Sequence, residues 1–480
     1  MATITYAMQQ DTVAAESIAY AAMRDTYWPS IEALRGGTLA MRDAGVTFLP
    51  MHSKEEAAQW SYRKNRSFLF PAYDNALKNL AAKPFQKPTT VDALPDAMLP
   101  IVDDVDLNGR DLTTFAHEVF EAGWHYGLTH ILVDYPVTGG MQTLGDEREL
   151  KIRPRFIHYK APSLFAWQTD RAPNGQTVVG EIRIRETQTE RVGQYQETEV
   201  GFIRVIRPDS WELWRETDNE PVLVESGSLT LGKVALVTFY TGRTGYMTAM
   251  PPMFGLADLN VQHWQVASDY GNILHVNMVP QMATSLTAEQ MSSVTIGPNR
   301  ITCLGDNEAW IKFVEHSGSS IASGREELDR IEGRMKMLAQ EPFLTAAPGT
   351  ATGRAIDESK SQASIYRSVR ALENCLEECF TLAAEWMKIE LPEDFAVDVY
   401  SDFVASLGGG DTKEIVAAWQ AGMITQETAL MELKRRGMLS DSIDVALEAE
   451  AAGQEHETQP VELAMPEMEP AEEPEMEPVV

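Results

Sequence analysis

The spacing of apolar residues predicts two long helices in the second half of the chain. Residues 354–390 carry a stripe at alternating steps of four and three, and residues 319–340 carry a second stripe at heptad spacing. A stripe this narrow needs a neighbouring helix, either in the same chain or in another copy of it. We expect packing between subunits, with these candidate residues in the first stripe: Ile365, Val369, Leu372 and Leu376.

Shorter helices and one buried strand are expected nearer the start. Residues 1–90 read as helical, with a break at the two glycines after Arg35. Leu112, Phe115, Val119 and Phe120 then lie at helical spacing, and Asp111 is a good N-cap for that helix. The apolar run 129–133 reads as a buried strand.

From about residue 150 to 242 the period changes to two, in runs such as VVGEIRIRE, VGFIRVIRP and KVALVTFY. We therefore expect a β-rich part. A helical pattern returns at 251–277, and residues 278–316 are mixed. The fold class predicted by this order is α+β.

The C-terminal part begins with a strand candidate at 395–403, followed by two short helices joined at Gly422. From residue 452 the chain is rich in Pro, Glu and Met. This composition has too few apolar residues to form a core, so we expect an acidic, disordered tail at 452–480.

A loop is expected directly before the most regular helix. Residues 342–353 hold Pro342, Pro348, Gly349 and Gly353, and no charged residue lies between Glu341 and Arg354. A flexible, uncharged loop next to a long helix is typical of a segment that moves while the helix stays fixed.

Charge narrows the classes of function. The chain has 480 residues and a formal net charge of −31, and no Lys or Arg follows Arg436. Such a balance excludes a general nucleic-acid coat, which needs a basic surface, but it leaves room for a channel through which nucleic acid slides. Three cysteines are too few for a disulfide framework, so a reducing compartment is expected. We expect neither a signal peptide nor a membrane span.

Candidate catalytic and metal motifs are weak. Residues 104–109 copy the first half of a calcium loop, but its twelfth position is Phe115 rather than a bidentate Glu. Gly349–Arg354 lacks the Lys-Ser/Thr pair of a phosphate loop. His117 and His125 are two helical turns apart, too far to share one ion. Cys375 and Cys379 are expected to be small buried side chains. We predict no catalytic residue, no metal and no cofactor.

The order of the sequence blocks resembles the portal proteins of tailed bacteriophages, the head-to-tail connector family. The resemblance covers about residues 20–440. It is carried by GGTLAMRDAGVTFLPMHSKEEAAQWSYRKNRSFLFPAYDNALKNLAAKPF, VDLNGRDLTTFAHEVFEAGWHYGLTHILVDYP, RPRFIHYKAPSLFAWQTD, PPMFGLADLNVQHWQVASDYGNILHVNMVPQM, TATGRAIDESKSQASIYRSVRALE and AGMITQETALMELKRRGML.

The resemblance implies a portal fold, assembled as a ring, with wing, helical stem, clip and helical crown. The implied regions are a wing at 1–251, stem helices at 252–277 and 317–341, a clip at 278–316, a tunnel loop at 342–353, a long wing helix and strand at 354–403, and a crown at 404–451. The loop would face the DNA channel, with these candidates: Phe343, Leu344, Thr345, Pro348, Gly349, Thr350, Thr352 and Gly353.

The implied function is that of a ring, usually of twelve copies, at one capsid vertex of a virion assembled in the host cytoplasm. Double-stranded DNA would be packaged and ejected through its channel without sequence preference. The implied partners are the terminase large subunit, head-completion or adaptor proteins, and the major capsid and scaffold proteins, with no membrane. Two alternatives remain open: another minor capsid protein of a phage, and a hydrolase with an unrecognised site.

Overall fold

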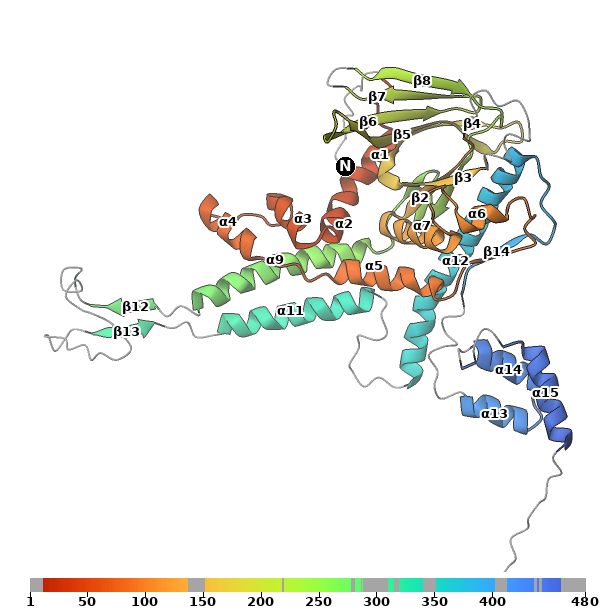
Figure 1. Ribbon diagram of the computed structural model, residues 1–480. Helices are drawn as coiled ribbons and strands as arrows, with labels where there is room; N and C mark the ends of the chain where they lie inside the picture. Colours follow the sequence, from red (N-terminus) through yellow and green to blue (C-terminus); the bar gives the residue numbers. More distant parts are fainter. Residues whose placement is uncertain are drawn as a thin grey trace, which may run out of the picture. The chain divides into compact units, whose positions relative to one another are not determined.

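The computed structural model of this protein describes residues 12–136, 152–217, 220–277, 281–285, 287, 310–314, 319–339, 351–401, 412–435, 438–439 and 443–458 (Figure 1). The chain divides into two compact units, Met1–Ser401 and Asp402–Val480. The first unit contains both helices and sheets, and the second unit is helical in its described part. Among the residues that the structure describes, no helix combines the length and apolarity that a membrane crossing needs.

The first unit begins with a series of short helices. Their bounds are α1 Ile18–Thr26, α2 Trp28–Arg35, α3 Gly37–Asp43, α4 Ala57–Arg66, α5 Ala72–Ala82, α6 Leu99–Asp103 and α7 Leu112–Tyr126, with short 3₁₀ turns at Gly45–Thr47 and Lys83–Phe85. Gly37 has φ +74°, a left-handed conformation that side chains disfavour, and it allows the chain to turn between α2 and α3. The predicted break after Arg35 is confirmed.

Helix α7 follows the local rules closely. The Asp111 carboxylate accepts a hydrogen bond from the Thr114 N–H at 3.1 Å, which satisfies one of the free amides of the first turn. The helix ends at Gly127, whose φ is +87° and where a Cβ would lie 2.7 Å from the Met250 carbonyl oxygen. The predicted cap and the buried apolar stripe of Leu112, Phe115, Val119 and Phe120 are confirmed.

Two antiparallel sheets form the β-rich part. The smaller has the order β3-β2-β9, and the larger is a meander in the order β4-β5-β6-β7-β8. Apolar side chains of both sheets, including Leu132, Ile182 and Ile206, pack into one core. The strands are β2 Leu128–Asp134, β3 Arg155–Lys160, β4 Leu164–Arg171, β5 Thr177–Arg191, β6 Glu197–Ile206, β7 Ser210–Arg215, β8 Val222–Ser228 and β9 Leu236–Tyr240.

Three short antiparallel pairs complete the strands. They are β1 Thr90–Asp92 with β14 Ala396–Asp398, β10 Arg243–Gly245 with β11 Thr248–Ala249, and β12 Gln281–Thr284 with β13 Ile311–Val314. The first pair joins two segments that are about three hundred residues apart in the sequence. The strand candidate at 395–403 is thus a strand over three of its residues.

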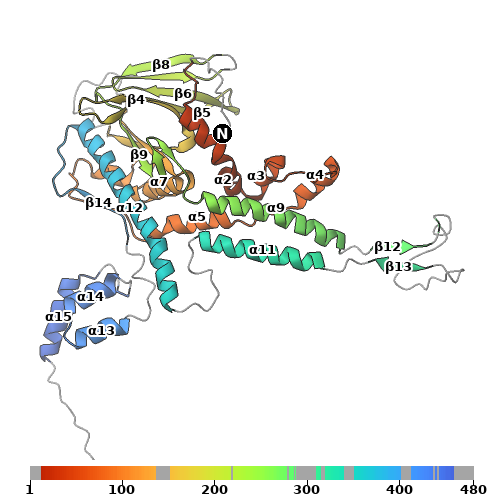
Figure 2. The same cartoon turned by 180° about the vertical axis from the view of Figure 1, so that it is seen from behind.

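The first unit also contains three long helices, of which α9 and α11 flank the β12–β13 pair. Helix α9 covers Phe254–Asn277, α11 covers Ser319–Leu338 and α12 covers Ala351–Met387. In both Figures 1 and 2, α9 and α11 lie side by side, and β12 and β13 follow beyond one end of the pair. The strands β12 and β13 fall inside the segment 278–316, whose remaining residues are mostly outside the described ones.

The second unit contains α13 Thr412–Gln420, α14 Gln426–Arg435 and α15 Val445–Thr458. Gly422, with φ +71°, lies in the turn between α13 and α14, as the sequence predicted. Helix α15 continues through residues 452–458, so the prediction of disorder from residue 452 onward is wrong for those residues. Residues 459–480 lie outside the described part.

His125 and His130 are buried in the first unit, and His158 is partly buried. His125 on α7 contacts the Tyr73 hydroxyl, and His130 on β2 contacts the Thr238 hydroxyl. His158 on β3 contacts the Thr129 hydroxyl at 2.8 Å. Burial lowers the pKa of each imidazole from its ordinary value of 6.5 to about 3, because the charged form would lose its hydration.

We expect the free energy of unfolding to decrease as the pH falls below about 6.5, because the unfolded chain then binds protons that the folded chain excludes. Each of the three histidines contributes up to about 1.4 kcal/mol per pH unit. Urea unfolding between about pH 7 and pH 5 measures this slope. His158→Gln should make the slope smaller, and an equal slope in the variant and the wild type would contradict the assignment.

Candidate functional site

The helices α9 and α11 are antiparallel and closely packed. Glu332 on α11 contacts the His263 ring nitrogen on α9 at 3.4 Å. Nearer the strand pair, a Cβ on Gly324 would lie 2.7 Å from the Tyr270 ring, so a larger residue there would force the ring or the helix to shift. At the other end Gly255 faces Leu338. Trp264, Ile331 and Met335 are fully buried between these helices and their surroundings.

A buried asparagine fixes α9 to the N-terminal helices. The N-cap position of α5 is Pro71, which offers no side-chain hydrogen bond. Asn260 supplies the missing acceptor: its Oδ1 accepts from the Tyr73 N–H, and its Nδ2 donates to the Phe70 carbonyl, both at 2.9 Å. Asn260 is fully buried. The amide side chain therefore satisfies backbone groups that would otherwise be buried without a partner.

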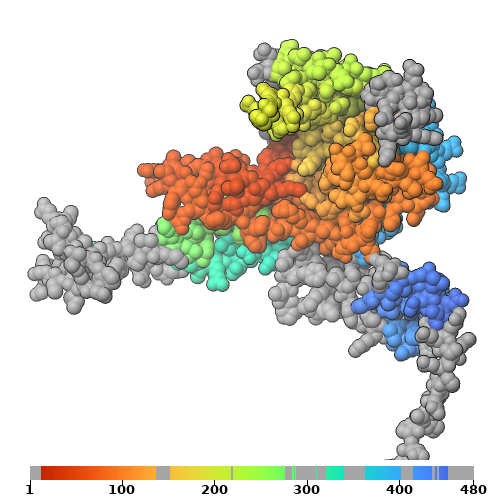
Figure 3. Space-filling view, viewed as in Figure 1, coloured from red at the N-terminus to blue at the C-terminus, as the bar shows by residue number. Residues whose placement is uncertain are grey.

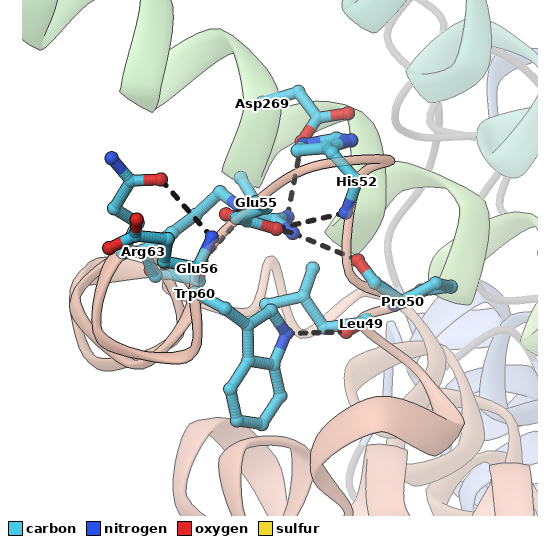
Figure 4. A network of polar contacts seen from close by, with 11 residues as sticks. Leu49, Pro50, His52, Glu55, Glu56, Trp60, Arg63 and Asp269 are labelled. Atoms are coloured by element: carbon cyan, nitrogen blue, oxygen red, sulfur yellow. Dashed lines mark hydrogen bonds and ion pairs between the residues drawn. The ribbon is translucent and has the colours of Figure 1, made fainter.

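A second contact between α9 and the N-terminal helices lies further along α9, at Asp269 (Figure 4). The Arg63 guanidinium on α4 is 4 % exposed and donates two hydrogen bonds to the Glu55 carboxylate, at 2.8 and 2.9 Å. It also donates to the Pro50 carbonyl at 2.8 Å and to the Asp269 carboxylate of α9 at 3.2 Å. These bonds lower the pKa of Glu55 to about 2. Arg63 thus joins the loop before α4, helix α4 itself and helix α9.

The long helix α12 packs on the body of its own chain. Ile365, Val369, Leu372 and Leu376 are each fully buried within the chain. Further along α12, Phe380 meets the Phe156 ring of β3 edge to face. The assignment of these four residues to a contact between subunits is therefore wrong, because their surfaces are already covered by the chain's own sheet and loops. The intramolecular alternative holds, although α12 packs largely on strands rather than on a helix.

Two carboxylates on α12 hold the strand β14. Glu377 accepts a hydrogen bond from the Val397 N–H at 3.2 Å, and Glu373 accepts one from the Val399 N–H at 3.1 Å. Glu373 is buried, and burial raises the pKa of its carboxyl above the ordinary value. Side chains of the helix thereby bond backbone amides near the edge of the β1–β14 pair.

Of the predicted channel-loop residues, six lie outside the described residues: Phe343, Leu344, Thr345, Pro348, Gly349 and Thr350. The other two, Thr352 and Gly353, belong to α12, which begins at Ala351. The loop boundary at residue 353 is therefore wrong, because the helix starts earlier than the glycine suggested.

The residues of the candidate metal and catalytic motifs have structural roles in the fold. The Asp106 carboxylate accepts from the Asn108 N–H at 3.0 Å and from Arg110 at 2.7 Å, while Asp104 accepts from the Gly109 N–H. His117 lies against Phe85, and Cys375 and Cys379 are buried thiols, as expected. Within the described part of the chain, no group of three or more His, Cys, Asp or Glu side chains is placed to hold a metal ion.

A cavity of about 490 Å³ lies beside the two sheets. Two ion pairs lie in its lining: Arg155 with Asp134 at 2.8 Å, and Arg204 with Glu186 at 2.7 Å. The Tyr159 hydroxyl donates to Glu186 at 2.6 Å. Its described lining holds no Ser, Cys or His.

Sequence reasoning did not single out Arg63, Glu55 or Asn260. Arg63 lies in a basic run that reads as a solvated helix face, and nothing in the sequence places it against α9. Asn260 interrupts the apolar pattern of α9, and a polar residue at such a position was the available signal. Its partners are backbone groups about 190 residues away.

The comparisons with known proteins are as follows. A family model described as a domain of unknown function (DUF4055) matches residues 252–387. No curated protein matches the chain. Three of the solved chains that are similar to it are described below. One comes from the virion of a native gene transfer agent (GTA) particle, with 13% identity and a TM-score of 0.43, and the match covers 83% of this chain and 98% of that chain.

The second solved chain belongs to the neck of an empty GTA particle computed with C6 symmetry, with 12% identity, a TM-score of 0.41 and coverage of 82% and 93%. The third belongs to the neck of a native GTA particle computed with C12 symmetry, with 13% identity, a TM-score of 0.40 and coverage of 76% and 89%. Because these TM-scores are below 0.5, we base no conclusion on the likeness.

We expect Arg63→Met to destabilise the first unit by about 3–5 kcal/mol, because it leaves the Glu55 carboxylate buried without its partner. The double variant Arg63→Met/Glu55→Met should lose less than the two single variants together. Arg330→Met, which removes an exposed pair with Glu327, is the matched control and should cost less than about 1 kcal/mol. Urea unfolding gives the values; equal costs for Arg63→Met and Arg330→Met would refute the network.

Leu372→Asp should prevent folding of the first unit, since it buries a charge in the core. Leu372→Met keeps the volume and should cost less than about 1.5 kcal/mol. Circular dichroism and the soluble yield measure both. A folded but unassembled Leu372→Asp protein would restore the interpretation of α12 as a contact between subunits.

Proposed function

We propose that this chain is a portal subunit: a ring of its copies forms the channel at one capsid vertex of a tailed phage-like particle. The observation that carries the proposal is the helix pair α9–α11 with the strand pair β12–β13 inserted between its helices. This hairpin extends from an α+β body, which is the arrangement that the resemblance in sequence implies for stem, clip and wing.

The contacts that fix α9 to the body suit a rigid stem helix. Asn260 and Arg63 fix the helix to the body through buried hydrogen bonds, and Gly324 brings α11 close to it. Breaking buried polar contacts of this kind costs much free energy, because it leaves donors and charges without partners. A stem in a channel has to keep its direction while DNA passes, and such contacts maintain it.

The stretch from Met337, near the end of α11, to Gly353, near the start of α12, suits a channel surface. From Met337 to Gly353 the only charged residue is Glu341, and at its start Met337 and Leu338 have exposed side chains. Each fixed cation facing DNA would form a phosphate contact and resist sliding. An uncharged surface in a chain with a net charge of −31 therefore favours passage over retention.

In this proposal the protein has no catalytic activity of its own. A terminase large subunit would supply the energy for packaging and would dock at the strand pair, where head-completion or adaptor proteins later bind. Major capsid and scaffold proteins would surround the ring.

Electron microscopy of the purified full-length chain tests the proposal. We expect rings with a central hole, with twelve copies in the particle. A protein that stays monomeric both in solution and in its particle would refute it, and oligomers without a central channel would favour another minor capsid protein.

Lysines in the proposed channel surface should slow DNA. We expect Thr345→Lys/Thr350→Lys to assemble rings as the wild type does, while DNA packaging falls by tenfold or more, because every copy adds two phosphate contacts. Thr345→Ser/Thr350→Ser is the matched control and should package normally. Packaged DNA per particle is measured by nuclease protection, and normal packaging by the lysine variant would exclude these residues from the channel surface.

A further inference from the structure

An exposed surface with apolar, aromatic and basic side chains covers α3, α4 and the residues that follow α4. Phe68 is 73% exposed, Leu39 is 71% exposed and Tyr62 is 53% exposed. The Leu69 N–H donates to the Thr38 hydroxyl, which places Phe68 and Leu39 on neighbouring backbone. We call this surface the aromatic patch. Large apolar side chains gathered in this way mark an interaction site rather than an ordinary surface.

Cations surround the aromatic patch. The Arg42 guanidinium lies over the Phe68 ring at 5.0 Å, Arg66 over Tyr62 at 5.2 Å, and Lys64 over Trp60 at 5.1 Å. Within the described part of the chain, none of these three cations has a carboxylate partner. A small groove of about 260 Å³, lined by Tyr62, Arg66 and Phe68, opens toward α9. The patch is therefore apolar and positive, in a protein whose net charge is −31.

A surface of opposite charge lies around α6 and the β1–β14 pair. Residues 89–107 contain five Asp, of which Asp104 and Asp106 pair with Arg153 and Arg110. Residues 389–401 contain four Asp or Glu, and the Lys87 ammonium lies over the Tyr400 ring at 5.3 Å. Pairing of Val91 with Val397 brings the two segments together. A groove of about 490 Å³ is formed there by Thr89, Thr90, Val91, Leu94, Leu99, Val102 and Asp103. We call this surface the acidic groove.

The acidic groove has room for apolar side chains. Leu99, at its wall, is 48% exposed. Asp92, Asp96 and Asp103 are exposed at its margin. Apolar side chains beside exposed carboxylates complement an aromatic side chain that is flanked by cations.

The two surfaces lie on opposite sides of the body of the first unit. In Figures 1 and 2, α3 and α4 lie on one side of α7 and β14 lies on the other, while β12 and β13 extend beyond α4. The space-filling view shows the orange-red residues of α3 and α4 on the surface (Figure 3). Two different, complementary surfaces on opposite sides produce head-to-tail contacts, and these close into a ring when the rotation between copies allows it.

We propose that the aromatic patch of one copy docks on the acidic groove of the next, with Phe68 entering the groove and Lys64 and Arg66 facing its carboxylates. This inference rests on the proposed ring function and names the surfaces that build the ring. The occupant of the patch is thus a second copy of this chain rather than DNA, because the groove supplies both apolar walls and negative charge.

Charge reversal tests the pairing. Lys64→Glu/Arg66→Glu reverses the patch, and Asp96→Lys/Asp103→Lys reverses the groove. Each variant alone should reduce the fraction of protein in rings at least tenfold, as counted by mass photometry at low salt. The chain carrying all four changes should recover rings, because the attraction is restored with opposite signs. Arg191→Glu, an exposed arginine at the end of β5, is the matched control and should form rings normally.

Phe68→Ala separates the apolar contribution from charge. This side chain is exposed, so the melting temperature should stay unchanged while rings decrease. If wild-type rings form and none of the variants alters them, the interface is wrong and the proposed ring function stands. If the chain carrying all four charge changes fails to recover rings, the pairing of these two surfaces is refuted. A wild type that never forms rings refutes the proposed function itself. Loss of DNA retention by Phe68→Ala with unchanged rings would assign the patch to nucleic acid instead.

Discussion

The direction of the long helix α9 depends on buried polar contacts where it crosses the N-terminal helices. Asn260 completes the first turn of α5, and Asp269 accepts from the buried Arg63. Apolar packing alone tolerates small sliding and rotation, since it has little directional preference. Hydrogen bonds to backbone groups fix both the depth and the rotation of a helix. The position of α11 and of the strand pair beyond it follows from that of α9.

The chain combines a strongly acidic total charge with a local group of cations that have no carboxylate partner among the described residues. Arg42, Lys64 and Arg66 lie over aromatic rings instead of beside carboxylates, although acids outnumber bases in the whole sequence by 71 to 40. In a monomer this arrangement gains little. In the proposed ring it would supply attraction at one pair of surfaces, while the remaining acidic surface would repel copies that approach in other orientations.

Local signals predicted the parts of the fold that depend on nearby residues. The Asp111 cap, the α7 stripe, the turn at Gly422 and the alternation of the β-rich part all act within a few residues, and the structure contains each. The α12 stripe shows the limit. Its spacing indicated an apolar seam, but a helix stripe packs on a sheet as well as on a helix, and spacing does not name the neighbour. Arg63 and Glu55 needed a tertiary contact to become recognisable as a buried pair.

The pairing of β1 with β14 has a consequence for the order in which the chain folds during synthesis. Strand β1 emerges early in synthesis, yet its partner in the described structure, together with Glu373 and Glu377 that bond the segment, follows almost three hundred residues later. Contacts of such high sequence separation form late and slowly. The acidic groove includes β1, so its final shape is completed only after α12 has docked. If copies associate through the acidic groove as proposed, synthesis order would delay that association until a subunit is whole, and nascent chains would not join one another on the ribosome.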